Sequence, residues 1–130
     1  SNPVVHFEMP ANDRERMKKF YESAFGWKMQ QLGVEMGNYV VAHTSETDEK
    51  TGMVKKPGMI NGGFYDRTDA TQAPSLVIAV DDIKAHIEIV KKAGGKIEGE
   101  PMDIPGIGWH AAFIDPEGNR VSMLQPSKQM

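Results

Sequence analysis

A histidine and a glutamate near the start of the chain are the residues best suited to chemistry. In the run Val4–Met9, apolar and polar residues alternate as expected for a β-strand. Successive side chains of a strand point to opposite faces, so His6 and Glu8 share one face. An imidazole beside a carboxylate can act as a general base in proton transfer. A structural role, in which His6 only hydrogen-bonds inside the fold, accounts for the residue equally well.

Other residues are candidates for contacting a ligand rather than for reacting with it. Tyr39 and Tyr65 can line the mouth of a cavity, although exposed or core roles explain them as well. Trp109 and His110 alternate on one expected strand, so one faces the cavity and the other the helices. Trp109 can wall a cavity for a flat ligand or pack in the core. Gly62, followed by a second glycine, leaves a bare stretch of strand that a ligand or backbone can approach closely.

The elements that must position these residues follow from the patterns around them. Pro10 ends the first strand, and Asn12 is expected to cap a helix, with Glu15 completing a capping box. The helix carries one apolar stripe at helical spacing, and Gly26 ends it. The stripe consists of Met17, Phe20, Tyr21 and Ala24. Three further strands are expected at residues 27–32, 38–44 and 59–65, with a polar loop at residues 45–58 between the last two.

The pattern then begins again, because the first half shifted by 69 residues matches the second without a gap. His6 falls on Ser75, Asp13 falls on Asp82, and Gly26 falls on Gly95. Internal periodicity of this kind fixes architecture. The sequence therefore predicts two β-α-β-β-β units, each too small to bury its own sheet face alone.

The second unit is expected to end in a β-hairpin. Its apolar runs are Trp109–Ile114 and Val121–Leu124, and the intervening Asp115-Pro-Glu-Gly-Asn119 has the residues of a tight turn. Before the hairpin we expect a short strand at residues 96–100 and a loop at residues 101–108.

Composition limits the classes of function. At 130 residues, with 39% hydrophobic and 25% charged residues, the chain is expected to be one globular domain. Its net charge of −3 argues against nucleic acid as a partner. Neither a membrane-spanning run nor a signal-peptide pattern is seen. The absence of cysteine excludes thiol chemistry and agrees with a cytoplasmic location.

The ordered set of these features resembles the vicinal oxygen chelate superfamily, which includes glyoxalase I, extradiol dioxygenases and bleomycin-binding proteins. The similarity rests on the two units, on Phe20-Tyr21 with Phe25-Gly-Trp27, on Pro105-Gly-Ile-Gly-Trp109 and on the terminal turn. The resemblance implies a cup-shaped mixed sheet with the helices outside and the functional cavity inside. It also implies that a single-domain chain completes the cup as a homodimer.

In the metalloenzymes of that superfamily, side chains on the first and last strands of each unit coordinate a divalent metal. Among the corresponding residues of this sequence, His6 matches the metal-ligand pattern. The others do not match it: Gly62 or its neighbour, Ser75 and Ser122. Such metals prefer imidazole nitrogen and carboxylate oxygen, and a serine hydroxyl stays neutral. A rearranged site joining Glu8, His43 or His110 to His6 has no support in their spacing. We therefore predict no metal and no other cofactor.

The sequence thus predicts an α+β domain over residues 1–130, with units at about residues 3–67 and 74–126. Its expected function is to bind a small molecule in the sheet cavity without the usual metal, as a cytoplasmic homodimer. Tyr39, Gly62, Tyr65, Ser75, Trp109, His110 and Ser122 are the expected ligand contacts. The alternative is an enzyme of the lyase or isomerase type related to lactoylglutathione lyase. It would use His6 and Glu8 for acid–base chemistry, or an atypical metal site.

Overall fold

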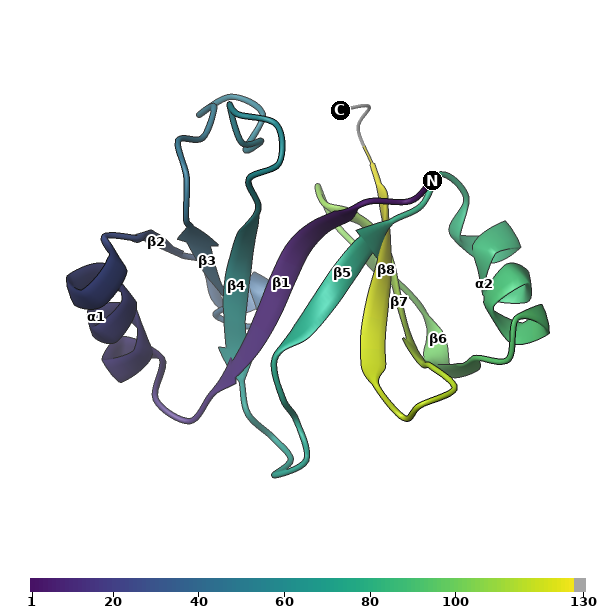
Figure 1. Ribbon diagram of the computed structural model, residues 1–130. Helices are drawn as coiled ribbons and strands as arrows, with labels where there is room; N and C mark the ends of the chain where they lie inside the picture. Colours follow the sequence, from purple (N-terminus) through teal and green to yellow (C-terminus); the bar gives the residue numbers. More distant parts are fainter. Residues whose placement is uncertain (128–130) are drawn as a thin grey trace. The chain divides into compact units, whose positions relative to one another are not determined.

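The computed structural model describes residues 1–127 as two compact units (Figure 1). The first unit is His6–Pro74, and the second is Ser1–Val5 together with the chain from Ser75 onward. Each unit contains a strand, a helix and three further strands in that order. The predicted α+β class and the two β-α-β-β-β units are therefore confirmed.

Four strands form the sheet of the first unit in the order β2-β3-β4-β1. Strand β1 runs parallel to β4, and the other neighbouring pairs are antiparallel. The elements of this half of the chain are β1 (Val4–Ala11), α1 (Arg14–Phe25), β2 (Lys28–Gln31), the short 3-10 helix η1 (Val34–Met36), β3 (Val40–His43) and β4 (Asn61–Asp66).

Helix α1 begins one residue later than the capping pattern predicts. Its N-cap is Asp13, whose carboxylate accepts a hydrogen bond from the backbone N–H of Arg16 at 3.0 Å. The expectation that Asn12 caps the helix is wrong, because Asp13 occupies the extended position from which a side chain reaches that N–H. The internal repeat carries the correct signal, since Asp13 falls on Asp82, which caps α2 (Ile83–Lys92) in the same way.

The core of the first unit lies between α1 and one face of the sheet. Val40, Ala42 and Phe64 are fully buried there, and Met17 and Tyr21 of α1 pack against them. These two helix residues are four apart and so lie in one row along the helix.

The predicted apolar stripe of α1 is broader than the partly buried row that packs against the core. Phe20 belongs to the stripe but lies beside the row formed by Met17 and Tyr21, and it remains 56% exposed. Phe25, at the end of the helix, is 64% exposed. The first unit therefore leaves aromatic surface on α1 uncovered.

The second unit repeats the arrangement with the sheet order β5-β8-β7-β6. Strand β5 runs parallel to β8, and the remaining pairs are antiparallel. Besides α2, its elements are β5 (Ser75–Ala79), β6 (Lys96–Ile104), β7 (Gly108–Ile114) and β8 (Arg120–Pro126).

Strand β6 is longer than the sequence predicts, so the expected loop at residues 101–108 is wrong in its first half. The strand continues through Pro101 to Ile104, with a register shift between Glu98 and Met102. Gly99 adopts φ +68° within this irregularity. A proline and a bulge are tolerated here because β6 lies at the edge of its unit's sheet.

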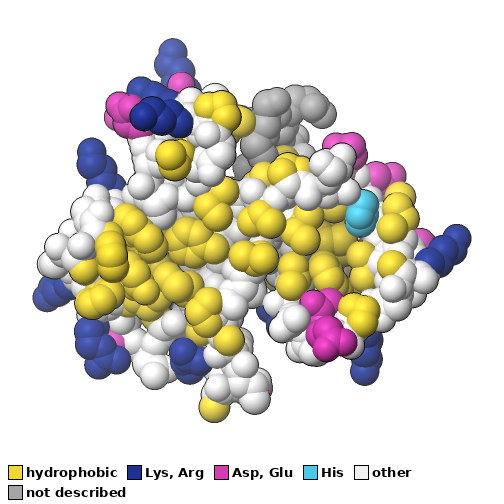
Figure 2. Space-filling model, viewed as in Figure 1, with side chains coloured by type: hydrophobic (Ala, Val, Ile, Leu, Met, Phe, Trp, Pro, Cys, Tyr) yellow, Lys and Arg dark blue, Asp and Glu magenta, His cyan; other side chains and the backbone are white. Residues whose placement is uncertain are grey.

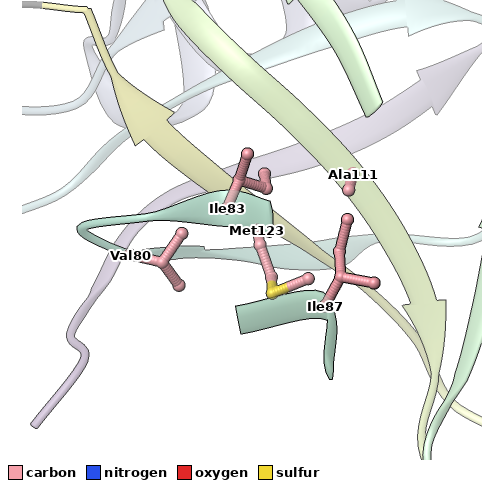
Figure 3. Packing of buried hydrophobic residues seen from close by; sticks show 5 residues of the cluster. All are labelled: Val80, Ile83, Ile87, Ala111 and Met123. Carbon is pink, nitrogen blue, oxygen red and sulfur yellow. The ribbon is translucent and has the colours of Figure 1, made fainter. Parts of the chain in front are cut away.

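The core of the second unit lies between α2 and its sheet (Figure 3). Ile83 and Ile87 of α2 meet Ala111 of β7 and Met123 of β8, with Val80 beside them. Odd-numbered residues of β7 and β8 therefore face the helix, and even-numbered ones face the opposite side.

The terminal hairpin is confirmed, with β7 and β8 paired from Gly108↔Pro126 to Ile114↔Arg120. The Asp115 carboxylate accepts hydrogen bonds from the backbone N–H groups of Glu117 and Asn119 at 2.9 and 2.8 Å. Gly118 adopts φ +87° in the turn, a conformation that glycine reaches without strain. Within residues 1–127, neither α1 nor α2 is long and apolar enough to cross a membrane.

Candidate functional site

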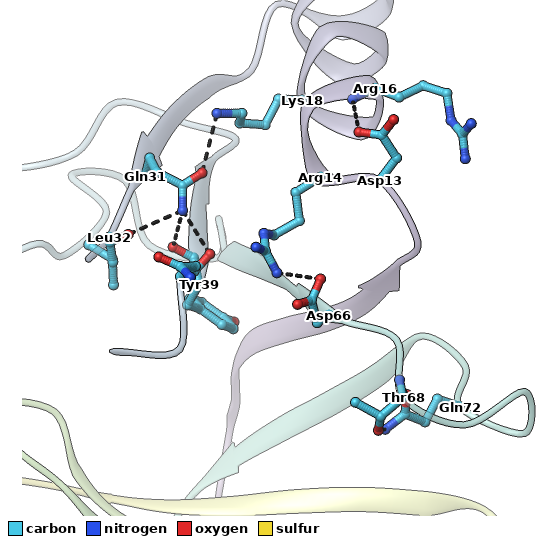
Figure 4. A network of polar contacts seen from close by, with 11 residues as sticks. Asp13, Arg14, Arg16, Lys18, Gln31, Leu32, Tyr39, Asp66, Thr68 and Gln72 are labelled. Atoms are coloured by element: carbon cyan, nitrogen blue, oxygen red, sulfur yellow. Dashed lines mark hydrogen bonds and ion pairs between the residues drawn. The ribbon is translucent and has the colours of Figure 1, made fainter. Parts of the chain in front are cut away.

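The turn after η1 places Tyr39 on the sheet face of the first unit that lies opposite α1. Gly37 and Asn38 both have positive φ values, +66° and +56°, and turn the chain back toward β3. The amide of Gln31 donates to the backbone carbonyl of Asn38 at 2.7 Å and to that of Tyr39 at 3.5 Å (Figure 4). This bonding fixes the backbone from which the Tyr39 ring projects.

Gly63 makes room for the Tyr39 ring to cross strand β4. A Cβ atom built on Gly63 would lie 2.0 Å from the Tyr39 hydroxyl oxygen, so the ring occupies the volume a side chain would need. From this position the hydroxyl oxygen reaches Nε2 of His6 on β1, at 3.0 Å. When the phenol donates to Nε2, the ring proton of neutral His6 stands on Nδ1.

Glu8 and Tyr65 belong to the same cluster. In the parallel pairing of β1 with β4, His6 stands beside Asn61, Glu8 beside Gly63 and Pro10 beside Tyr65. Burial raises the pKa of the Tyr39 phenol above its usual range, and the nearby Glu8 and then Tyr65 raise it further. The phenol therefore keeps its proton and remains available as a hydrogen-bond donor to a neighbouring base.

Gly62, an expected ligand contact, lies on the opposite face of β4. A Cβ atom there would lie 2.3 Å from the ring of Phe7, which packs against the core on the α1 side. The two adjacent glycines thus accommodate two rings, Phe7 on one face and Tyr39 on the other.

The second unit presents an equivalent set of positions on its own face opposite α2. Glu8 pairs with Gly63, and Val77, which is 69 residues after Glu8, pairs with Ser122. The structure therefore places Ser122 and Gly63 at corresponding points of the two units.

Tyr39 also has a counterpart in the second unit. Val41 pairs with Gly63 as Ala112 pairs with Ser122, so Tyr39 and His110 each lie two residues before the corresponding point. By the same repeat, Ser75 stands where the first unit has His6. The histidine and the tyrosine that meet in the first unit thus correspond to Ser75 and His110 in the second.

Ser122 is the most buried polar residue of this second set. Its exposed fraction is 0%, and its Oγ atom has no hydrogen-bond partner within residues 1–127. A buried hydroxyl without a partner costs about 1–3 kcal/mol. Water or a ligand group at this point would remove that cost.

Trp109 and His110 lie on opposite sides of β7, which answers the question the sequence leaves open. His110 shares the face of Ser122, whereas Trp109 lies on the α2 side and is 39% exposed. Its neighbour Gln125 confirms this direction, because the Gln125 side chain accepts from the N–H of Ile83 at the start of α2. Trp109 thus lies away from the other expected ligand contacts of its unit.

The residues present do not suit the divalent metal that the resemblance implies. His6 is bonded to Tyr39, and the corresponding positions carry Gly63, Ser75 and Ser122, of which the serines are neutral, weak ligands. Among the described residues, no three His, Cys, Asp or Glu side chains lie close enough to hold a metal ion.

Sequence reasoning missed the role of Gly63 and the contact that it allows. The signal was present as the Gly62-Gly63 pair. Assigning the Phe7 ring to one glycine and the Tyr39 ring to the other requires knowing which sheet face each glycine lies on. His6 and Tyr39 are 33 residues apart, and no local pattern links them.

Comparisons with known proteins agree with this fold. The sequence profile of the Glyoxalase/Bleomycin resistance protein/Dioxygenase superfamily matches residues 4–123. A probable lactoylglutathione lyase of Vibrio cholerae is 27% identical over 124 residues, covering 94% of this chain and 89% of that protein. A glyoxylase-like domain-containing protein of Didymella fabae is 34% identical over 124 residues, covering 89% and 88%.

A solved structure of methylmalonyl-CoA epimerase from Mycobacterium tuberculosis has the same fold. It matches with a TM-score of 0.68 at 12% identity, covering 96% of this chain and 88% of that one. The chain belongs to the glyoxalase/bleomycin resistance protein/dioxygenase superfamily.

Proposed function

We propose that the protein binds a small molecule on the sheet face of its first unit, at His6, Glu8 and Tyr39. The observation that carries this proposal is the 3.0 Å contact between His6 Nε2 and the Tyr39 hydroxyl, beside Glu8. Binding sites of this kind need a few placed polar groups on a mostly apolar surface. The second unit carries the buried Ser122 hydroxyl at the corresponding position of its own sheet.

In this proposal the ligand is held without the usual divalent metal. The argument rests on the donor set, because Ser75 and Ser122 stand where the resemblance requires a histidine and a glutamate. A serine hydroxyl keeps its proton near neutral pH and does not replace either ligand.

A second candidate function is proton transfer of the lyase or isomerase type, and the cluster around Tyr39 favours it. The His6 imidazole or the Glu8 carboxylate can take a proton from a carbon next to a carbonyl group, beside the Tyr39 phenol, which keeps its own proton. The relative from Vibrio cholerae is named a probable lactoylglutathione lyase, which makes lactoylglutathione a reasonable first substrate to test.

The first experiment is elemental metal analysis of the natively purified protein, with calorimetric titration of nickel, zinc, manganese and iron(II). We expect no stoichiometric metal and no saturable binding of these ions. A stoichiometric metal would contradict the metal-free proposal. A thermal-shift screen of small carbonyl and aromatic compounds then identifies a ligand.

His6→Ala tests both candidate functions. We expect at least about tenfold weaker binding of the ligand found in the screen, because the variant removes a hydrogen-bonding group at the site. For proton transfer, the native protein should exchange solvent deuterium into the carbon next to the thioester carbonyl of lactoylglutathione, and the variant should not. The deuterium exchange is followed by NMR for the native protein and for the variant.

His86→Ala is the matched control for that test, since His86 lies on α2 in the second unit. Equal loss of binding in both variants would point to a general effect on folding. Unchanged affinity in His6→Ala would remove His6 from the site.

We also propose that the protein forms a homodimer. The proposal rests on the small size of each unit. The single helix of each unit covers only one face of its four-stranded sheet.

A further inference from the structure

A groove in the first unit lies apart from the cluster around His6, at the end of α1 where the helix begins. Its volume is about 430 Å³, within the range of small-molecule sites. Met17, Phe20 and Tyr21 of α1 form its apolar wall, and Arg16 and Arg67 supply its positive charge.

The apolar wall is aromatic and already accessible. Phe20 is 56% exposed, and its ring meets the ring of Tyr21 edge to face at a centroid distance of 4.9 Å. Hydrophobic side chains gather over the α1 side of this unit in Figure 2. An aromatic or aliphatic group placed against Phe20 would remove this apolar surface from water.

The charges of the groove favour an anion. The Arg67 guanidinium donates a hydrogen bond to the backbone carbonyl of Gln72 at 2.6 Å, which holds it in place. The backbone N–H of Arg67 donates to the backbone carbonyl of Ala11. Within residues 1–127, the Arg16 guanidinium has no ion pair, and Figure 4 shows its side chain extending away from Asp13.

Among the described residues that line the groove, Asp13 is the single acidic one, and it does not neutralise both arginines. The Asp13 carboxylate accepts a hydrogen bond from the backbone N–H of Arg16, so it is already engaged in capping the start of α1. The two guanidinium groups therefore leave one unmatched positive charge among the lining residues. Because the cap already satisfies the start of the helix, recognition of an anion must come from the arginine side chains.

We propose that this groove is a second binding site, which takes a small carboxylate with an aromatic or aliphatic tail. The carboxylate pairs with Arg67 and Arg16, and the tail lies against Phe20 and Met17. Guanidinium groups recognise carboxylates by charge-assisted hydrogen bonds, and an apolar wall beside them selects for the tail.

Calorimetric titration of the full chain with 4-phenylbutyrate tests the site, with the neutral 4-phenylbutanamide as the comparison ligand. We expect the carboxylate to bind and the amide to bind at least about tenfold more weakly, because the amide loses the charge-assisted hydrogen bonds. Equal affinity for the two compounds, or no binding of the carboxylate at millimolar concentration, would overturn the proposal.

Variants locate the binding. Arg67→Gln should weaken carboxylate binding about tenfold, whereas Lys84→Gln, which removes an exposed charge on α2, should leave it unchanged. Phe20→Ala should weaken binding of both compounds, because it removes the apolar wall from an exposed position without opening the core. Equal effects of Arg67→Gln and Lys84→Gln would overturn the assignment to this groove.

His6→Ala separates this site from the proposed function. Binding of 4-phenylbutyrate should be the same in the variant and in the native protein, because His6 does not line the groove. Loss of binding in His6→Ala would move the carboxylate to the cluster around His6 and would refute the second site.

Discussion

Tyr39 shows how one side chain depends on the absence of another. Its hydroxyl reaches His6 across β4 because Gly63 leaves the surface of that strand free. The sequence predicts that His6 and Glu8 share a face, and the pairing of β1 with β4 agrees. It does not predict the partner of His6, because that partner depends on a turn and a glycine far away in the chain. The catalytic roles of His6 and Glu8 stay predictions.

Replacing Tyr39 by phenylalanine should change the response of stability to alkaline pH. The folded chain holds the Tyr39 pKa above the usual value of about 10, so above that pH the unfolded chain loses a proton that the folded chain keeps. This difference lowers the free energy of unfolding as the pH rises. We expect the native protein to lose more stability than Tyr39→Phe between about pH 8 and about pH 11, measured by urea unfolding.

Tyr21→Phe is the control for this measurement, because the Tyr21 ring stacks on Trp27 rather than standing beside Glu8. At neutral pH, Tyr39→Phe should also cost about 1 kcal/mol through the lost bond to His6. Parallel pH curves for the native protein and Tyr39→Phe would contradict the raised pKa.

At the scale of the elements, local signals predicted most of what the structure contains. The terminal hairpin follows from the turn residues between two apolar runs, and its full register agrees. Boundaries were less predictable where a tertiary position decides them. Pro101 reads as a loop residue, yet it lies within β6 because an edge strand can leave that backbone position unpaired. Phe20 fits the apolar stripe, yet the sheet covers only the row through Met17 and Tyr21.

The turn of the hairpin should be sensitive to acid. Hydrogen bonds from the Asn119 side chain, then from the backbone N–H groups of Asn119 and Glu117, lower the pKa of Asp115. A lowered pKa contributes stability that is present above the unfolded value of about 4 and is lost as the pH falls through the folded value. Asp115→Ala should therefore lose more stability at about pH 7 than at about pH 2, measured by urea unfolding.

Glu117→Ala is the matched control in the same turn, because its backbone N–H still donates to Asp115. It should have a small effect that is similar at the two pH values. An Asp115→Ala variant destabilised equally at both pH values would argue against the ionised carboxylate as the source of the effect.

At the scale of the whole molecule, the repeat explains the architecture better than it explains the site. The shift of 69 residues aligns the helix caps Asp13 and Asp82, so the second half has the same order of elements as the first. The same shift aligns His6 with Ser75, so the two units share an architecture without sharing the same chemical groups. Family membership therefore gives the fold more firmly than the reaction.

The proposed homodimer has a direct test in solution. Light scattering at micromolar concentration should give twice the 14.4 kDa mass of the chain. The physical reason is the uncovered sheet face of each unit, which a second copy would cover. A mass equal to that of a single chain across the concentration range would count against the dimer.

The placement of the two tryptophans gives each half of the chain its own optical reporter. Trp27 stacks on Tyr21 in the first unit, with ring centroids 4.6 Å apart, whereas Trp109 stands on β7 of the second unit and is 39% exposed. Their fluorescence therefore originates in different surroundings, because Trp27 stacks on another ring and Trp109 is partly exposed to solvent. A chain with either indole replaced by phenylalanine would emit from a single half. The two emission curves on heating would then distinguish one cooperative melting event from two successive ones.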